Sequence, residues 1–519
     1  MMRKMEKMTG ALDEGLIKNN IIAYLEGSAQ RFPDKTAYFD ETGGYTYERL
    51  LNESRAIASK LIKKLNTVCR PVLIYMDKAP KVLCAFFGTV MSRNFYVPLD
   101  TAMPEYRLSL IVENLKPIAV ITDIAHFDTA RTFSSNVYIF EEMIETKTEL
   151  DRIEERLSEA LDTDPVYVLY TSGSTGVPKG VVVSHRSLMD YVDHFTAECG
   201  ITSEDVIANQ APFYFDASLI DIYCTLRMGG SMGIVPTEYF SIPLKLLQFL
   251  QDYKITTIRW VPSAMKIVST FKGFKSLRPA YLNKIIFGAE SMPTKCYNYW
   301  KENYPEAVFI QIYGPTEITG VCTYYIVDRE FADDETIPIG KPFKNTEILL
   351  LDEEDKLIRR KDVVGEICVK GSCLALGYYN SREKTAEVFV QNPLNPYYPE
   401  KIYRTGDLAR YNEKHELVFV SRKDFQIKHM GHRIELGEIE MVVASLPGIK
   451  AVCCVFEPVK SKIVLFFESD SYDEIELSEL LKSKLVHYMM PNVFKRLDRL
   501  PLMQNGKVDR TVIKEMIRP

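Results

Sequence analysis

The sequence predicts an α/β fold, and two patterns in its first 340 residues carry that prediction. Short apolar runs end in glycine-bearing loops, namely VYVLY before TSGSTG, KIIF before GAE and VFIQIY before GPTE. Each run is expected to form a fully buried strand of a parallel sheet with helices on both faces. Helical patterns lie between the runs, and this alternation is typical of α/β proteins. Because such sheets bind ligands at the carboxyl ends of their strands, the three loops point to one shared site.

One of the intervening helices is predicted within SIPLKLLQFLQDYK, residues 241–254. Apolar side chains at Leu244, Leu247, Phe249 and Leu250 fall on one face of this helix. A stripe of that kind predicts which side of the helix is buried against a sheet.

The sequence changes character after about residue 340. The runs EILLLDEED, GEICVKG and HELVFVSR predict short strands of a small β subdomain. Beyond residues 422–424 the chain is expected to form a small α+β unit. In that unit Ile439, Val442, Val443 and Leu446 have the i, i+3, i+4, i+7 spacing of a helix. We therefore predict two domains, residues 1–422 and 423–519.

Composition restricts the classes of function. The 519 residues carry a formal net charge of −6, which argues against a nucleic-acid-binding protein, since these have strongly basic domains. No apolar window approaches the length of a membrane span, and the basic amino terminus lacks the apolar stretch of a signal peptide. None of the ten cysteines forms a C-x-x-C pair. Buried thiols in a reducing compartment are thus expected, and the protein is predicted to be cytoplasmic.

The loop TSGSTGVPKG, residues 171–180, combines three glycines, four hydroxyl side chains and one lysine. Backbone N–H groups, hydroxyls and an ammonium are all donors, so the loop suits a polyphosphate. It is not a Walker A loop, because its lysine follows Pro178 instead of a glycine. A glycine- and serine-rich surface turn is the alternative interpretation. Its position after a predicted buried strand favours phosphate binding.

Further segments complete a resemblance that runs through nearly the whole chain. They are YTYERL (45–50), YVPLD (96–100), FDAS (215–218), YGPTE (313–317), GEICVKGSCLALGYYN (365–380), YRTGDLAR (403–410), RKDFQIKHMGHRIELGEIE (422–440), YMMP (488–491) and NGKVDR (505–510). With the loop at 171–180, they resemble the adenylate-forming superfamily, in particular the amino-acid adenylation domains of nonribosomal peptide synthetases. The free-standing D-alanine–carrier protein ligases are similar too. The resemblance implies a large amino-terminal domain of stacked sheets flanked by helices, followed by a small mobile α+β domain.

The same resemblance implies that ATP and Mg²⁺ are bound. The residues expected to contact ATP are Thr171, Ser172, Gly173, Ser174, Thr175, Gly176, Lys179, Gly288, Ala289, Glu290, Tyr313, Gly314, Thr316, Asp407 and Arg422. Among these, Tyr313 would lie against the adenine and Asp407 would bind the ribose hydroxyls. Glu317 matches a Mg²⁺-binding glutamate, as suits a hard cation that prefers oxygen ligands. Alternatively, Asp407 could cap a turn and Glu317 could pair with a surface arginine.

Lys507 matches the family's catalytic lysine. A carboxylate that attacks the α-phosphate builds negative charge, which a lysine at the junction stabilises; the alternative is a solvated lysine. Since Lys507 belongs to the small domain, the two domains must meet. The resemblance implies rotation of the small domain about a hinge at Asp424. In the second orientation HMGHRIELGE would face the active site and line the entry of a thiol.

Asp216 matches the aspartate that binds the α-ammonium group of amino-acid substrates, although it could instead cap a helix. The other residues aligned with the substrate pocket are Ala217, Ile220, Arg259, Ile286, Gly288, Ile312, Gly320 and Val321. Arg259 is the exception in this small or aliphatic set, because a buried arginine needs an acidic partner. Either the substrate carries a second carboxylate, which we prefer, or Arg259 pairs with an acid of the protein.

No phosphopantetheine attachment motif and no condensation motif occurs in the sequence. We therefore expect a stand-alone, monomeric enzyme that loads an amino acid onto a separate phosphopantetheinylated carrier protein. An acyl- or aryl-coenzyme A ligase of the same fold is one alternative, and a non-catalytic scaffold protein with this fold is another.

Overall fold

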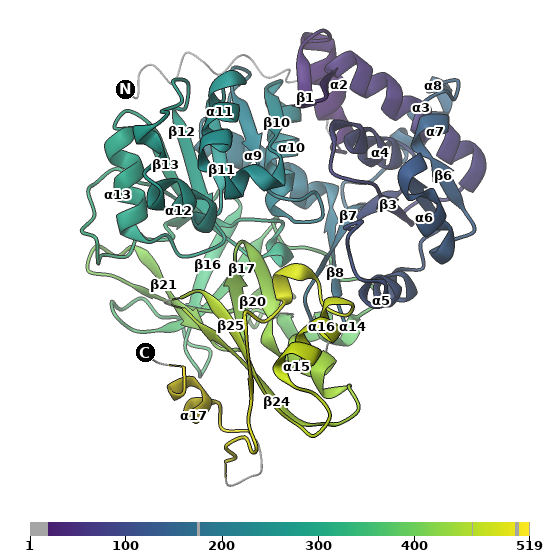
Figure 1. Ribbon diagram of the computed structural model, residues 1–519. Helices are drawn as coiled ribbons and strands as arrows, with labels where there is room; N and C mark the ends of the chain where they lie inside the picture. The colour runs from purple at the N-terminus through teal and green to yellow at the C-terminus, as the bar shows by residue number, and fades with distance from the viewer. Residues whose placement is uncertain (1–18, 174–176, 459, 504–507, 518–519) are drawn as a thin grey trace.

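A computed structural model describes residues 19–173, 177–458, 460–503 and 508–517. The fold is mixed α/β, with a large amino-terminal and a small carboxyl-terminal domain, as the sequence predicts. In Figure 1 the carboxyl-terminal elements, in light green and yellow, lie against the lower side of the large domain. The predicted boundary at residues 422 and 423 falls between two strands, β21 and β22, and stays a prediction.

The largest sheet in the described part of the chain has nine strands in the order β15-β14-β13-β12-β11-β9-β10-β1-β2. Its central strands, from β13 to β1, are parallel, whereas β2, β14 and β15 are antiparallel to their neighbours. The bounds are β1 Thr36–Asp40, β2 Gly43–Thr46, β9 Val206–Asn209, β10 Ser231–Ile234, β11 Thr257–Trp260, β12 Lys284–Gly288, β13 Val308–Tyr313, β14 Thr323–Ile326 and β15 Lys341–Pro342. The predicted strands KIIF and VFIQIY are therefore confirmed as β12 and β13.

A second sheet has seven strands in the order β18-β8-β7-β4-β3-β5-β6. Strand β7 contains the predicted run VYVLY and pairs parallel with β4 and antiparallel with β8. The bounds are β3 Pro71–Tyr75, β4 Phe95–Pro98, β5 Ala119–Thr122, β6 Val137–Ile139, β7 Pro165–Thr171, β8 Lys179–Ser184 and β18 Gly377–Tyr378. The loop 171–180 is thus the connection between β7 and β8.

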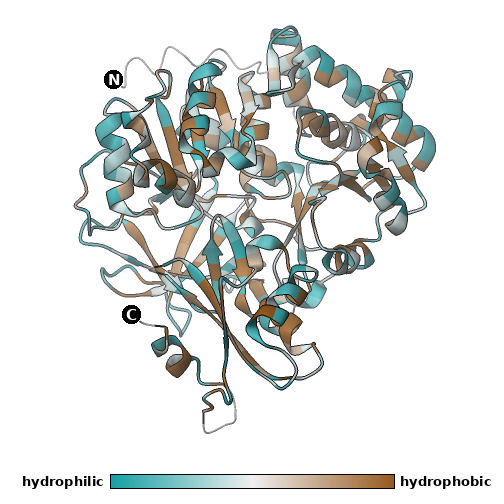
Figure 2. Ribbon diagram, in the orientation of Figure 1, coloured by the Kyte–Doolittle hydropathy of each residue, from teal (hydrophilic) through white to brown (hydrophobic). Residues whose placement is uncertain are grey.

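Helices cover both sheets of the large domain (Figure 1). They are α2 Ile22–Arg31, α3 Tyr47–Leu65, α4 Pro80–Met91, α5 Glu105–Leu115, α6 Phe127–Phe133, α7 Phe140–Met143, α8 Leu150–Ser158, α9 His185–Glu198, α10 Ala217–Met228, α11 Pro243–Asp252, α12 Pro262–Thr270, α13 Thr294–Asn303 and α14 Arg382–Val388. The main core cluster combines α3, α4, α9 and α10 with strands of both sheets. Figure 2 shows the matching pattern, with hydrophobic strands inside and hydrophilic outer faces on the helices.

The stripe predicted on α11 is wrong at one position. Leu246, Leu247, Phe249 and Leu250 are buried, but the side chain of Leu244 is 55% exposed. Leu244 follows Pro243 in the first turn, and the residue that takes its place on the buried face is Leu246.

The predicted β subdomain is present as a sheet of β16, β17, β20 and β19, with β21 paired to β20. Its bounds are β16 Thr346–Leu351, β17 Gly365–Gly371, β19 Phe389–Gln391, β20 Lys401–Tyr411 and β21 Leu417–Arg422. The register of β20 and β21 places Asp407 opposite Arg422. Two of the residues expected to contact ATP are therefore neighbours on adjacent strands.

The small domain begins with the hairpin of β22 and β23 and continues into an α+β unit with its own core. Its elements are β22 Gln426–His429, β23 His432–Glu435, α15 Leu436–Ala444, β24 Ile449–Glu457, β25 Lys462–Ser469, α16 Glu474–Lys482, β26 Val493–Arg496 and α17 Arg510–Glu515. Ile439 and Val443 are fully buried on α15, and Leu446 is buried just beyond its end, as the spacing predicts.

Candidate active site

Asp407 lies at the centre of a buried polar network that is built by the large domain. The hydroxyl group of Tyr313, at the end of β13, donates to Oδ2 of Asp407 at 2.5 Å. Nη1 of Arg422 donates to Oδ1 at 2.5 Å, and Nε and Nη2 of Arg422 donate to the two carboxylate oxygens of Asp424 at 2.7 and 2.8 Å. The carboxylate of Asp407 thus has two donors, and both come from residues predicted to bind ATP.

Glu317 is fully buried, and its carboxylate is nevertheless ionised. Its carboxylate accepts hydrogen bonds from the hydroxyl group of Tyr378 and from Nη1 of Arg433, both at 2.7 Å. Burial acts to raise the pKa of Glu317, but the charges of Arg433 and Lys179 outweigh it and lower that pKa to about 2. The partner of Glu317 is therefore a partly buried arginine of the small domain, not the surface arginine of the alternative interpretation.

This carboxylate fits a Mg²⁺ site. The described residues include no group of three His, Cys, Asp or Glu side chains that could hold a metal ion by themselves. Mg²⁺ commonly needs only one or two carboxylates, because phosphates and water supply its other ligands. An ionised, buried Glu317 meets that requirement. In the present orientation of the small domain, however, one of its oxygens is bound to Arg433.

The phosphate loop also takes its partners from the small domain. Oγ of Ser172 donates to the carbonyl oxygen of Arg433 at 2.8 Å, and the backbone N–H of Gly173 donates to Oε2 of Glu438 at 3.2 Å. Gly173 is needed here because a Cβ atom would lie 2.1 Å from the carbonyl oxygen of Val177. Nζ of Lys179 lies 5.2 Å from the ring centre of Tyr378. Ser174, Thr175 and Gly176 lie outside the described residues.

Two more contacts hold the small domain in this orientation. The guanidinium group of Arg107 on α5 forms a buried ion pair with Glu438 on α15. The backbone N–H of Gly431, in the turn of the β22–β23 hairpin, donates to Oε1 of Glu290 at 2.7 Å. Oε2 of Glu290 accepts from the N–H of Ser263. The segment HMGHRIELGE therefore faces the site, as expected for one of the two orientations, and Figure 1 shows α15 close to α5.

A cavity of about 580 Å³ lies between the two domains. Its large-domain wall comes from the ends of β3, β9, β11 and β12, and its small-domain wall comes from residues 429–432 and 487–492. The ring of His432 stacks on that of Tyr488 at 3.9 Å between centres. Burial, with His487 and His429 nearby, lowers the pKa of His432 to about 3, so its imidazole is neutral at pH 7.

Four residues predicted from the sequence line this cavity, namely Ala217, Arg259, Gly288 and Ala289. The remaining pocket candidates do not line it. Asp216 is not among the lining residues, although its neighbours Phe215 and Ala217 are. Ile220, Ile286, Ile312 and Val321 are buried in the main core cluster, and Gly320 packs close to Tyr191. The other residues predicted to bind ATP, Gly314 and Thr316, follow β13 beside Glu317.

Asp216 precedes α10 but makes no capping hydrogen bond with its side chain. The helix-cap alternative is therefore not what the structure shows. Burial raises the pKa of Asp216, while a hydrogen bond from Thr316 and the charge of Arg259 oppose that rise. A carboxylate in this setting would gain from a cationic partner.

Arg259 has an acidic partner within the protein. Its Nε lies 3.2 Å from Oδ1 of Asp221, a fully buried residue of α10, and Oδ2 of Asp221 accepts from Nδ2 of Asn209 at 2.8 Å. The second of the two alternatives for Arg259 is therefore present in the structure. Because Arg259 also lines the cavity, this pairing does not remove it from contact with a substrate.

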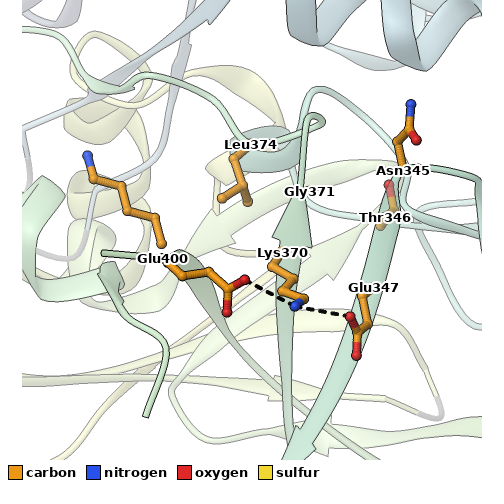
Figure 3. Close-up of a pocket in the computed structure, with 8 residues that line it drawn as sticks. Asn345, Thr346, Glu347, Lys370, Gly371, Leu374 and Glu400 are labelled. Atoms are coloured by element: carbon orange, nitrogen blue, oxygen red, sulfur yellow. Dashed lines mark hydrogen bonds and ion pairs between the residues drawn. The ribbon is translucent and has the colours of Figure 1, made fainter. Parts of the chain in front are cut away.

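A second hollow, on the surface of the β subdomain, shows no such convergence (Figure 3). Its one central lysine, Lys370, is bound to Glu347 and Glu400, each at 3.2 Å. None of the residues predicted from motifs lines it. Its two lysines and two glutamates balance in charge, so nothing about this hollow indicates a bound ligand.

Lys507 lies outside the described residues, so its place in the site stays a prediction. Sequence reasoning missed several residues that the structure brings to the site, namely Lys78, Arg107, Tyr378, Arg433 and Tyr488. Lys78 follows the apolar strand VLIY, so the rule that ligands bind at the carboxyl ends of strands could have predicted it as a site residue. The pairing of Arg107 with Glu438 has no signal in the sequence.

The comparisons with known proteins agree with this geometry. A family model described as AMP-binding enzyme matches residues 25–379. The chain belongs to this family. D-alanine–D-alanyl carrier protein ligase from Bacillus licheniformis is 30% identical over 512 residues, which cover 96% of this chain and 99% of the relative. Bacitracin synthase 1 from the same species is 32% identical over 500 residues, which cover 94% of this chain.

The chain spans only 9% of bacitracin synthase 1 and 44% of tyrocidine synthase 1 from Brevibacillus parabrevis. Among solved structures, holo-PA1221, a protein containing adenylation and PCP domains, aligns with a TM-score of 0.81 at 21% identity. The alignment covers 96% of this chain and 85% of that one, and it shows a shared fold. In the part of the AMP-binding enzyme that the structure describes, no helix is both long and apolar enough to cross a membrane.

Proposed function

We propose that the protein activates an amino acid with ATP as the aminoacyl adenylate and transfers it to the phosphopantetheine thiol of a separate carrier protein. The observation that supports this most is that Asp407 is bound by Tyr313 and Arg422, while Glu317 is bound by Arg433 of the small domain, which also closes one side of a cavity. Membership of the AMP-binding family and the similarity to a carrier protein ligase over its whole length support it as well.

In this proposal the carboxylate of Asp407, held in place by Tyr313 and Arg422, accepts hydrogen bonds from the ribose hydroxyls. Tyr313 lies against the adenine. The loop of residues 171–179 donates to the β- and γ-phosphates. Glu317 would hold Mg²⁺, whose charge neutralises the phosphates. Lys507, from the small domain, stabilises the negative charge that builds where the substrate carboxylate meets the α-phosphate.

Asp216 would bind the α-ammonium group of the substrate, a charge-assisted contact that an acyl- or aryl-coenzyme A ligase does not need. After pyrophosphate leaves, the orientation with HMGHRIELGE at the site would receive the thiol, and Asp424 would serve as the hinge. All ten cysteines are free and nine are buried, which agrees with a cytoplasmic enzyme. One chain supplies both walls of the cavity, as a monomer would.

The test is an ATP–pyrophosphate exchange screen over L-, D- and β-amino acids, followed by thiol loading. The proposal predicts exchange with at least one amino acid and transfer to a holo carrier protein rather than to coenzyme A. Release of a coenzyme A thioester would instead identify the acyl-coenzyme A ligase. Lack of exchange with every acid would leave the scaffold interpretation.

D-Alanine is a specific second candidate as substrate, because two relatives named D-alanine–D-alanyl carrier protein ligase match over 99% of their length. In the same screen, D-alanine would then give the strongest exchange.

A further inference from the structure

Lys78 is a lysine in the wall of the cavity to which no role has been assigned. It follows the end of β3, and its Nζ donates to the carbonyl oxygen of Gln210 at 3.1 Å. The same ammonium group lies 5.6 Å from the ring centre of Phe213. Lys78, Gln210 and Phe213 line the cavity together with Arg259. Two cationic side chains therefore reach one enclosed space.

These two cations lie near one fully buried carboxylate behind the cavity wall, that of Asp221. Asp221 is bound to Arg259 and Asn209, and Lys78 feels its charge without forming an ion pair with it or with any other described carboxylate. Strand pairing brings the group together, because Ile258 of β11 lies opposite Ala208 of β9, one residue before Arg259 and Asn209. Burial raises the pKa of Asp221, and the charges of Arg259 and Lys78 oppose that rise.

The other acidic residues in the cavity wall are engaged elsewhere. Asp100 accepts a hydrogen bond from the hydroxyl group of Tyr214. Asp77 is largely exposed and lies 3.4 Å from Nε2 of His126, and it also accepts from Thr101. The imidazoles of His429, His432 and His487 and the phenol of Tyr488 belong to the small-domain wall. None of these groups forms an ion pair with Lys78, so its ammonium group has no anionic partner among the described residues of the cavity wall.

We propose that Lys78 is a specificity-determining residue that, together with Arg259, binds an anionic group on the side chain of the substrate. The amino acid chosen by this site would then be one with a second carboxylate. A carboxylate placed between an ammonium and a guanidinium group gains charge-assisted hydrogen bonds, and in a buried site it also removes an uncompensated charge. This inference rests on the proposed function.

Burial lowers the pKa of the Lys78 ammonium group to about 7, with the charge of Asp221 acting in the opposite direction. A bound anion favours the protonated form, so substrate and proton would bind together. The affinity for an acidic substrate is therefore expected to fall as the pH rises through 7. A neutral substrate would show no such dependence on Lys78.

The experiment measures ATP–pyrophosphate exchange with the D- and L-forms of aspartate and glutamate, their amides asparagine and glutamine, and alanine. We expect an acidic amino acid to give the highest kcat/KM in the wild type. Lys78→Met should lower that value by roughly 10- to 100-fold, as for loss of a partner to a buried charge, while the value for the matching amide changes less than about threefold. The rise of KM with pH should disappear in this variant.

Lys81→Met is the matched control. Lys81 lies three residues further along and pairs with Asp123 and Glu141 outside the cavity, so this variant should behave as wild type. If Lys78→Met does not fold, Lys78→Arg takes its place as the test variant. Because arginine keeps its charge at pH 8.5, exchange with the acidic substrate by Lys78→Arg should persist at that pH.

Two outcomes overturn the inference and leave the proposed function standing. One is a wild type that prefers a neutral amino acid such as D-alanine. The other is a Lys78→Met variant that loses exchange equally with the acid and with its amide. Absence of exchange with every amino acid would overturn the proposed function and this inference with it.

Discussion

The two ends of the predicted nucleotide site are held in different ways. Around Asp407, the donors Tyr313 and Arg422 both come from the large domain. At the phosphate loop and at Glu317, the partners Glu438 and Arg433 come from the small domain. Asp407 would keep these two donors in any orientation of the small domain, although Lys428 of that domain also lies 5.4 Å from the ring centre of Tyr313. The contacts of Gly173 and Glu317 with the small domain would be lost if that domain rotated.

The difference shows which groups can report on domain orientation. Glu438 places a carboxylate at the N–H of Gly173, and Arg433 places a cation at Glu317. These are the charges that a phosphate and a metal ion would bring to the same atoms. A variant at the phosphate end should therefore separate the two half-reactions, and a variant at Asp407 should not.

The largest effect is expected at Lys507, which would complete the phosphate end in the other orientation. Lys507→Ala should lower ATP–pyrophosphate exchange by roughly 10²–10³-fold, the usual cost of losing a well-placed electrostatic stabiliser. The fold should stay intact, as a thermal unfolding curve would show. Exchange at the rate of the wild type would remove Lys507 from the mechanism.

The next effect is expected from Arg433→Ala, which breaks the pair with Glu317. A hydrogen bond between charged groups is worth about 1.5–3 kcal/mol, so thiol transfer should fall by roughly 10- to 100-fold. Exchange should stay within about threefold, because Glu317 keeps Tyr378 and Lys179 as neighbours. Arg410→Ala is the control, since Arg410 pairs with Asp362 on the surface. Equal loss of both half-reactions would contradict the idea that the contact of Arg433 with Glu317 serves thiol transfer alone.

A smaller effect is expected from Asp407→Asn, which keeps the shape of the side chain but removes its charge. Loss of a charge-assisted hydrogen bond of about 1.5 kcal/mol should raise KM for ATP roughly tenfold. Calorimetry should find AMP binding weakened to the same degree, because both donors to Asp407 come from the large domain. The interpretation fails if ATP affinity is unchanged or if only thiol transfer suffers.

The smallest effect is expected at the hinge. Asp424→Pro fixes φ at this residue and should lower thiol loading more than exchange, by a factor of about three or more. Asp424→Ala is its control, because it removes the carboxylate bound to Arg422 without restricting the backbone. If the two variants behave alike, rotation about Asp424 is not supported.

Much of the fold could be predicted because local patterns determine it. The runs before TSGSTG, GAE and GPTE form strands β7, β12 and β13, and Ile439 and Val443 are buried on a helix as their spacing requires. Leu244 was misplaced because an apolar residue in the first helical turn need not face the core.

The site was predictable only where a motif exists. Asp407 and Arg422 are neighbours because their strands pair. A motif at each position can indicate a shared site, whereas the periodicity of apolar residues cannot predict which strands pair. The partner of Arg259 is Asp221 on α10, and that of Arg107 is Glu438, more than 300 residues away in the sequence. Such pairs depend on tertiary packing, so no local pattern could give them.

The cavity between the domains has a further consequence, since the small domain supplies part of its wall. An aminoacyl adenylate is a mixed anhydride, which water can hydrolyse. The stack of His432 on Tyr488 and the contact of Gly431 with Glu290 cover the space where such an intermediate would wait. In the proposed reaction these contacts would keep bulk solvent away from the adenylate, and they would limit how much activated amino acid is lost as free acid and AMP.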